Sequence, residues 1–519
     1  MNLPRSSGIL LHPTSLPGPD GIGDLGPEAY RWIDFLHASG TQLWQILPLG
    51  PTGYGDSPYQ CFSAFAGNPY LVSPILLLES GLLKTSDLRQ RQEFPENTVD
   101  FGPVIQWKSH LLDTAFNNFL TLQSSEIADQ FEHFKRENSN WLDDYGLFMA
   151  IKESQGGQSW SDWPKALKFR EFTALEQVRL ELATVIEKVK FSQFLFNQQW
   201  QNLKNYAHEK EIRIIGDMPF VIAFDSADTW ANPQLFLMDE SLSPTMVAGV
   251  PPDYFSATGQ LWGNPLYNWP VHAQQNYDWW ARRLGAVLSM VDLVRLDHFR
   301  GFAGAWHVPF GSENAIKGEW KKSPGLELFT ALQKHFPDLP IIAEDLGVIT
   351  PDVEELRDGF GFPGMKILQF AFSGDPQDDF LPHHYPVNCF AYTGSHDNET
   401  AQGWFDHATL KEKKFCLDYL GANETEVPHR MIREVWRSVA DFAIAPMQDF
   451  LGLGSEARMN LPGCASGNWS WRMPKRALSS ELKDQVYQLN FLYSRLPEKE
   501  IARNSQAHKA ETSGAVQPH

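Results

Sequence analysis

The sequence predicts an α/β fold, a (β/α)8 TIM barrel with inserted, mainly helical subdomains. The first observation is a set of eight short apolar runs, four to six residues long, that suit buried parallel strands. The second is that helical patterns fall between them. The third is that no Gly-x-Gly-x-x-Gly follows the first run and no Walker loop occurs, which weakens the alternative of a doubly wound sheet.

The apolar runs place the strands along the chain. The expected strands are Ile9–Pro13, Leu43–Pro48, Ile212–Asp217, Leu293–Asp297, Pro340–Asp345, Lys366–Phe370, Cys389–Tyr392 and Phe442–Pro446. Ala29, Trp32, Ile33 and Leu36 have helical spacing, and Pro27 suits the first turn of that helix. A second helix is expected over Val353–Arg357, opened by Thr350-Pro351-Asp352.

The spacing of the strands predicts the domain organisation. Residues 1–70 begin the barrel, and 71–210 are read as a helical insertion, although these helices could instead simply coat the barrel. Residues 211–496 complete the barrel. Within them, about 220–280 is rich in Pro, Gly, Trp and Tyr and predicts a structured loop insertion. Residues 497–519 are polar and lack aromatics, which predicts a flexible tail.

Composition excludes several classes of partner. A net charge of −20 argues against a broad nucleic-acid surface and against anionic membranes. No apolar run approaches the ~20 residues of a membrane helix. A strand expected close behind Met1 leaves no room for a leader, and four scattered cysteines suit a reducing compartment, so we expect a cytoplasmic protein. Aromatics make up 13% of the chain; most belong to the core, but some could be platforms for sugar rings.

Acidic residues stand where the expected strands end. Asp217 ends the third strand, Asp297 the fourth and Glu344 the fifth, while His396-Asp397 lies just past the seventh. Any one of them could be an ordinary helix cap or loop acid. In a (β/α)8 barrel, however, these strand ends surround the active site, so together they predict a mouth lined by carboxylates.

Clustered carboxylates bind metals, transfer protons or attack as nucleophiles. His298, His396, Asp297 and Asp397 are metal-ligand types, but no helical histidine pair at ligand spacing supports a metal, so none is expected. Glycoside cleavage fits better, because it needs one ionised and one protonated carboxyl group. The two histidines could then bond to sugar hydroxyls, or simply be buried with satisfied partners.

Local surroundings assign the two roles. Arg295 and Asp297 are two residues apart and emerge on the same face of a strand, so the guanidinium would keep this carboxylate ionised as a nucleophile. Glu344 follows the apolar residues 341–343, which would raise its pKa and make it the proton donor. Asp345 points to the other face and is read as structural.

Longer motifs add a family resemblance. The chain resembles the amylomaltases, or disproportionating enzymes, the 4-α-glucanotransferases of glycoside hydrolase family seventy-seven, over roughly residues 7–496. The motifs are Ser7-Gly8-Ile9-Leu10-Leu11-His12-Pro13-Thr14-Ser15-Leu16-Pro17, Gly53-Tyr54-Gly55-Asp56-Ser57-Pro58-Tyr59-Gln60, Gly216-Asp217-Met218-Pro219, Gly249-Val250-Pro251-Pro252-Asp253-Tyr254-Phe255, Gly259-Gln260-Leu261-Trp262-Gly263-Asn264-Pro265, Arg295-Leu296-Asp297-His298-Phe299-Arg300, Ala343-Glu344-Asp345-Leu346-Gly347, Gly394-Ser395-His396-Asp397-Asn398-Glu399-Thr400 and Gly454-Ser455-Glu456-Ala457-Arg458-Met459-Asn460.

The resemblance implies roles for individual residues. It implies Asp297 as nucleophile, Glu344 as acid/base and Asp397 as transition-state stabiliser. The residues that it implies around the glucan are Tyr59, Asp217, Arg295, His298 and His396, then Ser57, Gln260, Trp262 and Asn460, and Tyr254 and Phe255 at the aromatic tip of a loop over the cleft. The substrates would be α-1,4-glucans and malto-oligosaccharides, with no cofactor and no metal. The reaction would be a retaining double displacement, with carboxyl groups about 5–5.5 Å apart.

Two other readings use the same residues. An α-glucan hydrolase of the amylase type needs the same acids, and only the acceptor distinguishes it from a transferase. The aromatic segment Pro251–Trp262 could exclude water in favour of a sugar, or merely pack the insertion. A non-catalytic carbohydrate-binding protein would be expected to lack one of the three acids, yet all three are present.

Overall fold

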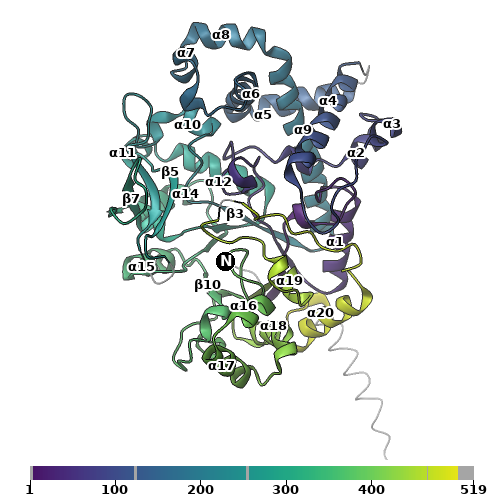
Figure 1. Ribbon diagram of the computed structural model, residues 1–519, viewed down its shortest axis with the longest axis vertical. Coiled ribbons are helices and arrows are strands. Elements are labelled where there is room, and N and C mark those ends of the chain that lie inside the picture. The colour runs from purple at the N-terminus through teal and green to yellow at the C-terminus, as the bar shows by residue number, and fades with distance from the viewer. Residues whose placement is uncertain (1–3, 122–124, 253–255, 465, 501–519) are drawn as a thin grey trace, which may run out of the picture.

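Eight parallel strands form the central sheet of the computed structural model, which describes residues 4–121, 125–252, 256–464 and 466–500 (Figure 1). Their order is β10-β11-β12-β1-β2-β3-β6-β9. The strands are β1 (Ser6–Leu10), β2 (Leu43–Gln45), β3 (Arg213–Met218), β6 (Leu293–Leu296), β9 (Ile341–Ala343), β10 (Gly364–Ile367), β11 (Cys389–Tyr392) and β12 (Phe442–Pro446).

A backbone hydrogen bond closes this sheet into a barrel. The N–H of Ala343 in β9 donates to the carbonyl of Pro363, next to β10, at 2.9 Å. The predicted (β/α)8 barrel is therefore confirmed. All eight expected strands are present, with boundaries shifted by up to three residues; the first, expected at Ile9–Pro13, is Ser6–Leu10. Their side chains are almost entirely buried, as the apolar runs predict.

Helices dominate residues 71–210. They are α2 (Pro74–Glu79), α3 (Thr85–Leu88), α4 (Phe101–Thr121), α5 (Ser125–Glu137), α6 (Ser139–Ser154), α7 (Lys165–Lys168), α8 (Phe172–Glu181) and α9 (Ala183–Glu209). In Figure 1, α5 to α8 gather at the top of the molecule. α9 instead lies on the barrel, where its Trp200 ring is 6.2 Å from the Trp44 ring of β2. That 71–210 forms a separate unit stays a prediction.

The remaining helices lie between barrel strands or after β12, and only 3-10 turns separate β10 from β11. Pro27 occupies the first turn of α1, and Pro351 that of α15, as expected. These helices are α1 (Pro27–Ala38), α10 (Ala227–Ala231), α11 (Trp269–Gln274), α12 (Asp278–Met290), α13 (Arg300–Ala303), α14 (Gly325–Gln333), α15 (Pro351–Gly359), α16 (Ala401–His407), α17 (Leu410–Leu420), α18 (Val427–Arg437), α19 (Met447–Phe450) and α20 (Ser480–Leu492). No helix in the described ranges is both long and apolar enough to cross a membrane.

A second, antiparallel sheet stands beside the barrel. Two of its strands lie within about 220–280, where the sequence predicted a structured loop insertion, and the other two lie in residues assigned to the barrel. The order of this sheet is β5-β4-β7-β8, with β4 (Met246–Val250), β5 (Gln260–Pro265), β7 (Gly304–Pro309) and β8 (Glu319–Lys322). β4 and β5 flank residues 251–259, and β5 brings Gln260 and Trp262 toward the barrel mouth. Tyr254, Phe255 and residues 501–519 of the expected tail lie outside the described residues.

Candidate active site

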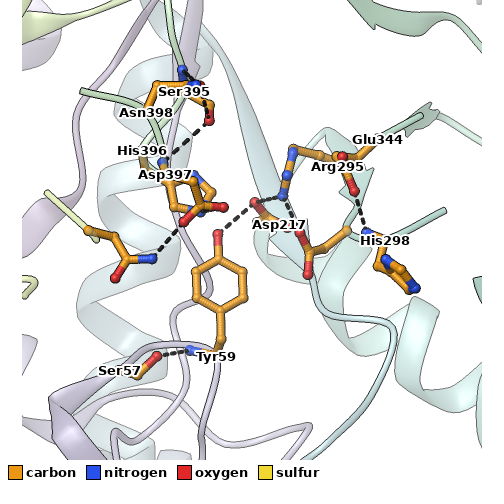
Figure 2. A network of polar contacts seen from close by, with 12 residues as sticks. Ser57, Tyr59, Asp217, Arg295, His298, Glu344, Ser395, His396, Asp397 and Asn398 are labelled. Carbon is orange, nitrogen blue, oxygen red and sulfur yellow. Dashed lines mark hydrogen bonds and ion pairs between the residues drawn. The ribbon is translucent and has the colours of Figure 1, made fainter. Parts of the chain in front are cut away.

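The predicted acids meet at the carboxyl ends of the barrel strands. Asp217 is the second-last residue of β3, and Asp297 and Glu344 directly follow β6 and β9. His396 and Asp397 follow β11. Figure 2 shows Glu344 and His298 on one side of Arg295 and Asp217, with Tyr59, His396 and Asp397 on the other. One mouth therefore contains acids from four strands.

Arg295 joins two of these acids. Its Nη1 lies 2.6 Å from Asp217 Oδ2 and 3.0 Å from Asp297 Oδ1, as the two-residue spacing on one strand face predicts. Burial on its own would lower the pKa of this guanidinium, but the charges of Asp217 and Asp297 outweigh burial and raise the pKa well above its ordinary value. Arg295 thus stays cationic and holds Asp297 in place through a charge-assisted hydrogen bond.

Tyr59 connects the two halves of the mouth. Its hydroxyl donates to Asp217 Oδ2 at 3.0 Å, and its ring stacks on His396 with centroids 5.2 Å apart. Ser57 Oγ accepts the Tyr59 N–H at 3.2 Å and fixes the backbone there. Burial raises the pKa of Asp217 to about 7 and that of Tyr59 well above its usual value, so the phenol stays a hydrogen-bond donor.

Glu344 is half-buried and is held by backbone N–H groups. Its Oε2 accepts the His298 N–H at 2.7 Å, and its Oε1 accepts the Leu346 N–H at 3.2 Å. Burial raises the pKa of Glu344 well above its ordinary value, and the nearby Asp297 adds to this rise against the opposing effect of Arg295. A carboxyl group with a raised pKa keeps its proton to a higher pH and can act as a general acid.

Asp345, the neighbour of Glu344, faces away from the mouth. Its Oδ1 accepts the Met365 N–H at 2.7 Å, and its Oδ2 forms an ion pair with Arg357 of α15. Both partners belong to the packing between β9, β10 and α15. The interpretation of this residue as structural therefore agrees with its contacts.

Asp397 is the most accessible of the acids. Its side chain is 41% exposed, whereas that of Asp217 is fully buried. Asn460 Nδ2 donates to Asp397 Oδ1 at 2.6 Å, and His396 Nε2 lies 3.4 Å from Asp397 Oδ2. On the backbone, Ser395 Oγ accepts the Asp397 N–H at 3.3 Å. The carboxylate is thus oriented by neighbours while one side stays open to a ligand.

An aromatic pair borders the opposite side of the mouth. The Trp262 ring meets the His298 ring edge-on at 4.8 Å, and its Nε1–H donates to Gln260 Oε1 at 3.2 Å. Burial lowers the pKa of His298 to about 4, so its ring is neutral and can bond to a hydroxyl group. His298 has a φ of 51°, a left-handed conformation that is uncommon for a residue other than glycine.

Two residues of the mouth were missed by the sequence analysis. Arg458 donates to the Asp397 carbonyl at 2.9 Å and pairs with Glu399 at 3.3 Å; its place two residues before Asn460 could have indicated it. The Trp469 ring lies 5.7 Å from Tyr59 and 6.0 Å from His396. No local sequence signal pointed to Trp469.

The polar groups suit sugar hydroxyls better than a cation. Within the residues that the structure describes, no three His, Cys, Asp or Glu side chains are grouped as metal ligands. Asp217 and Asp297 share the guanidinium of Arg295 instead. The predicted site residues that are described form two groups of contacts. One group joins Ser57, Tyr59, Asp217, Arg295, Asp297, His396, Asp397 and Asn460, and the other joins Glu344, His298, Trp262 and Gln260.

Comparisons with known proteins agree on one family. The family model of glycoside hydrolase family 77, described as 4-alpha-glucanotransferase, matches residues 11–479. The 4-alpha-glucanotransferase of Thermus thermophilus is 50% identical over 489 residues, which cover 93% of this chain and 97% of that protein. That of Synechocystis is 50% identical over 495 residues, which cover 95% and 98%. The amylomaltase from Streptococcus agalactiae, solved in complex with acarbose, has a TM-score of 0.92 at 40% identity and covers 95% of this chain and 100% of that chain.

Proposed function

Because the chain belongs to glycoside hydrolase family 77 and is a 4-alpha-glucanotransferase, we propose that Asp297, Glu344 and Asp397 perform its transfer of α-1,4-glucan segments. The observation that carries this assignment is their convergence at one mouth around Arg295 and Tyr59. We place malto-oligosaccharides and longer α-1,4-glucans at this mouth; a relative of the same fold was solved in complex with acarbose.

In the first step Asp297 attacks the anomeric carbon of the donor sugar. Glu344 gives its proton to the glycosidic oxygen, the first glucan leaves, and a β-linked glucosyl-enzyme forms. Two features support these roles: the Arg295 guanidinium at 3.0 Å from Asp297, and the burial that raises the pKa of Glu344. The guanidinium beside Asp297 and the raised pKa of Glu344 fit a nucleophile and a proton donor, respectively.

In the second step a new glucan replaces the first. Its 4-hydroxyl gives a proton to the Glu344 carboxylate and attacks the anomeric carbon, which releases Asp297 with net retention. Asp397, oriented by Asn460, would bind sugar hydroxyls and favour the distorted, oxocarbenium-like ring. His396, His298, Tyr59, Asp217 and Trp262 would surround the same ring, with Ser57 and Gln260 supporting them.

Incubation with maltotriose tests the assignment. The wild-type enzyme should give glucose together with a ladder of longer oligosaccharides, since transfer lengthens one product as it shortens another. Asp297→Asn should lower this turnover by at least ~1,000-fold, because the nucleophile is lost. Asp129→Asn, which changes an exposed acid on α5, is the matched control and should keep full turnover. Undiminished turnover in Asp297→Asn would refute the proposed nucleophile.

We also propose a cytoplasmic location and a role in carbohydrate metabolism. All four cysteines, Cys61, Cys389, Cys416 and Cys464, are free, which suits a reducing compartment. Fractionation of the producing cells, with the maltotriose assay on each fraction, tests the location: the activity should remain with the soluble contents of the cell.

A further inference from the structure

A small cavity lies beside His396. Its volume is about 20 Å³, and its polar lining includes His12, Ser15, His396, Glu399, Gln448 and Arg458. A water molecule needs roughly 10–15 Å³ and two to four polar partners. The cavity therefore has the room and the chemistry for one ordered water.

His12 presents a defined hydrogen-bonding face to this cavity. It lies two residues after the end of β1 and is buried. The backbone N–H of Leu47 donates to His12 Nδ1 at 3.2 Å, so this nitrogen is an acceptor without a proton. Burial lowers the pKa of His12 to about 3, which keeps the ring neutral. In a neutral ring with Nδ1 as acceptor, the single proton is on Nε2.

Within the described part of the chain, His396 lacks a hydrogen-bond donor at one ring nitrogen, whereas His12 has one to give. The Nε2 of His396 lies 3.4 Å from Asp397 Oδ2, the arrangement of an Nε2–H that points toward a carboxylate. Its Nδ1 is then an acceptor, and this atom is buried and has no hydrogen-bond partner among the described residues. A buried acceptor without a donor destabilises the fold, so a donor is expected nearby.

We propose that a water molecule in this cavity accepts the His12 Nε2–H and donates to His396 Nδ1, which makes His12 a positioning residue for Asp397. The hydrogen bonds would then run in one direction, from the Leu47 N–H through His12, the water and His396 to Asp397. This chain fixes the His396 ring as an Nε2–H donor toward the carboxylate. The inference rests on the proposed role of Asp397 in the reaction.

Two substitutions separate this role from simple support of the Leu47 backbone. In His12→Asn the amide oxygen takes the place of Nδ1 and can still accept the Leu47 N–H, but no donor reaches the cavity. In His12→Gln the amide nitrogen takes the place of Nε2 and donates to the cavity, while the Leu47 N–H loses its acceptor. A purely structural role predicts that His12→Asn is the milder change; the proposed role predicts the reverse for catalysis.

Steady-state kinetics with maltotriose provide the first measurement. We expect His12→Asn to lower kcat about tenfold, the effect of one hydrogen bond lost in the transition state, with KM and the melting temperature close to wild type. His12→Gln should keep more of kcat and melt at a lower temperature. His272 of α11 is the matched control, because it is buried and bonded to the Leu235 carbonyl; His272→Asn should lower the melting temperature and leave kcat unchanged. A kcat for His12→Gln as low as that for His12→Asn would overturn the proposal.

The ring nitrogens of His396 provide a readout that is independent of turnover. With ¹⁵N-labelled histidine, its signals are identified by their loss in His396→Gln. They should show the Nε2–H form in the wild type and a mixture of forms in His12→Asn; an unchanged form would overturn the proposal. Asp397→Asn separates the two hypotheses. If that variant keeps full turnover, the proposed function of Asp397 fails; if it is inactive while His12→Asn matches wild type, only the role of His12 fails.

Discussion

His298 shows how one backbone angle organises two catalytic groups. Its φ of 51° lies in the left-handed region, which costs of order 1–3 kcal/mol for a residue other than glycine. This conformation follows directly after Asp297 and directs the His298 N–H to Glu344 Oε2 at 2.7 Å. The strained residue thus couples the proposed nucleophile to the proposed acid.

Glu344→Gln tests the proton transfer at the residue scale. An amide cannot protonate the leaving glucan, so turnover of maltotriose should fall by about 10²–10⁴-fold. Maltosyl fluoride has a leaving group that needs no proton. With this donor, the rate of the step that releases fluoride should fall much less in Glu344→Gln than turnover of maltotriose does. In the wild type, kcat/KM for maltotriose should fall as pH rises through the raised pKa of Glu344, because the first step needs the protonated acid. Equal losses with both donors would argue against Glu344 as the acid.

At the scale of elements, α19 holds the segment that contains Asp397. Asp449 of α19 is buried, and its two oxygens accept the Ala401 N–H at 2.7 Å and the Thr393 hydroxyl at 2.6 Å. Thr393 directly follows β11, and Ala401 begins α16, so the two contacts flank His396 and Asp397. One carboxyl group therefore fixes both ends of this segment.

Asp449 should also make stability depend on pH. Burial raises the pKa of Asp449 to about 6, above the ~3.9 of an unfolded Asp, so the folded state binds this proton more tightly. Its contribution to the free energy of unfolding is therefore complete below pH ~4 and falls by up to ~3 kcal/mol as pH rises through about 6. Asp449→Asn cannot ionise. In urea unfolding, the wild type should exceed this variant in free energy of unfolding by less at pH 7.5 than at pH 4. A difference that stays constant with pH would contradict the prediction.

The segment between β4 and β5 should determine the choice of acceptor. If the aromatic residues there favour a sugar over water, Tyr254→Ala and Phe255→Ala should lower the ratio of transfer to hydrolysis several-fold. The measurement compares glucose release with disproportionation products from the same maltotriose reaction. Leu410→Ala, at an exposed apolar residue of α17, serves as the control. If the ratio of transfer to hydrolysis is unchanged in both aromatic variants, this prediction is wrong.

The buried barrel strands could be predicted from the sequence, and the strands of the second sheet could not. The barrel strands are apolar because both faces are covered, and Pro27 and Pro351 mark helix starts. β8 was missed because all four of its residues are exposed and three of them are charged, so it has no apolar pattern. Asp297, Glu344 and Asp397 could be predicted because they follow strands, and the carboxyl ends of the strands surround the active site of a (β/α)8 barrel. Trp469 was missed because only tertiary packing brings it to Tyr59.

At the scale of the whole molecule, Arg5 and Arg495 link the first strand to later segments through hydrogen bonds to backbone carbonyls. Arg495 is fully buried and donates to the carbonyls of Ser6, Trp436, Ala440 and Asp441 at 2.8–3.0 Å. Arg5 donates to the carbonyls of Tyr493, Ala440, Trp436 and Ser438 at 2.7–3.1 Å. Together they join β1, the segment after α18 and the segment after α20.

Arg495→Met should destabilise the fold without affecting the chemistry. Four carbonyls would lose the Arg495 donor, of which those of Trp436 and Ala440 keep their bonds to Arg5. The free energy of unfolding should fall by about 3–5 kcal/mol. Because Arg495 lies at the amino ends of β1 and β12, kcat at 25 °C should stay close to wild type. Arg433→Met, which removes a more exposed contact to the Tyr493 hydroxyl, is the control and should cost less than about 1 kcal/mol. Denaturant unfolding that shows equal losses for both variants would contradict this prediction.

The place of β1 between β2 and β12 has a consequence for biosynthesis. β1 leaves the ribosome more than 400 residues before its second neighbour, which ends at Pro446. During most of translation one edge of this apolar strand is consequently open to pairing with other nascent chains. Chaperone demand should therefore peak late in synthesis, and ribosome-bound chains that stop short of residue 446 should aggregate more readily than full-length chains once released.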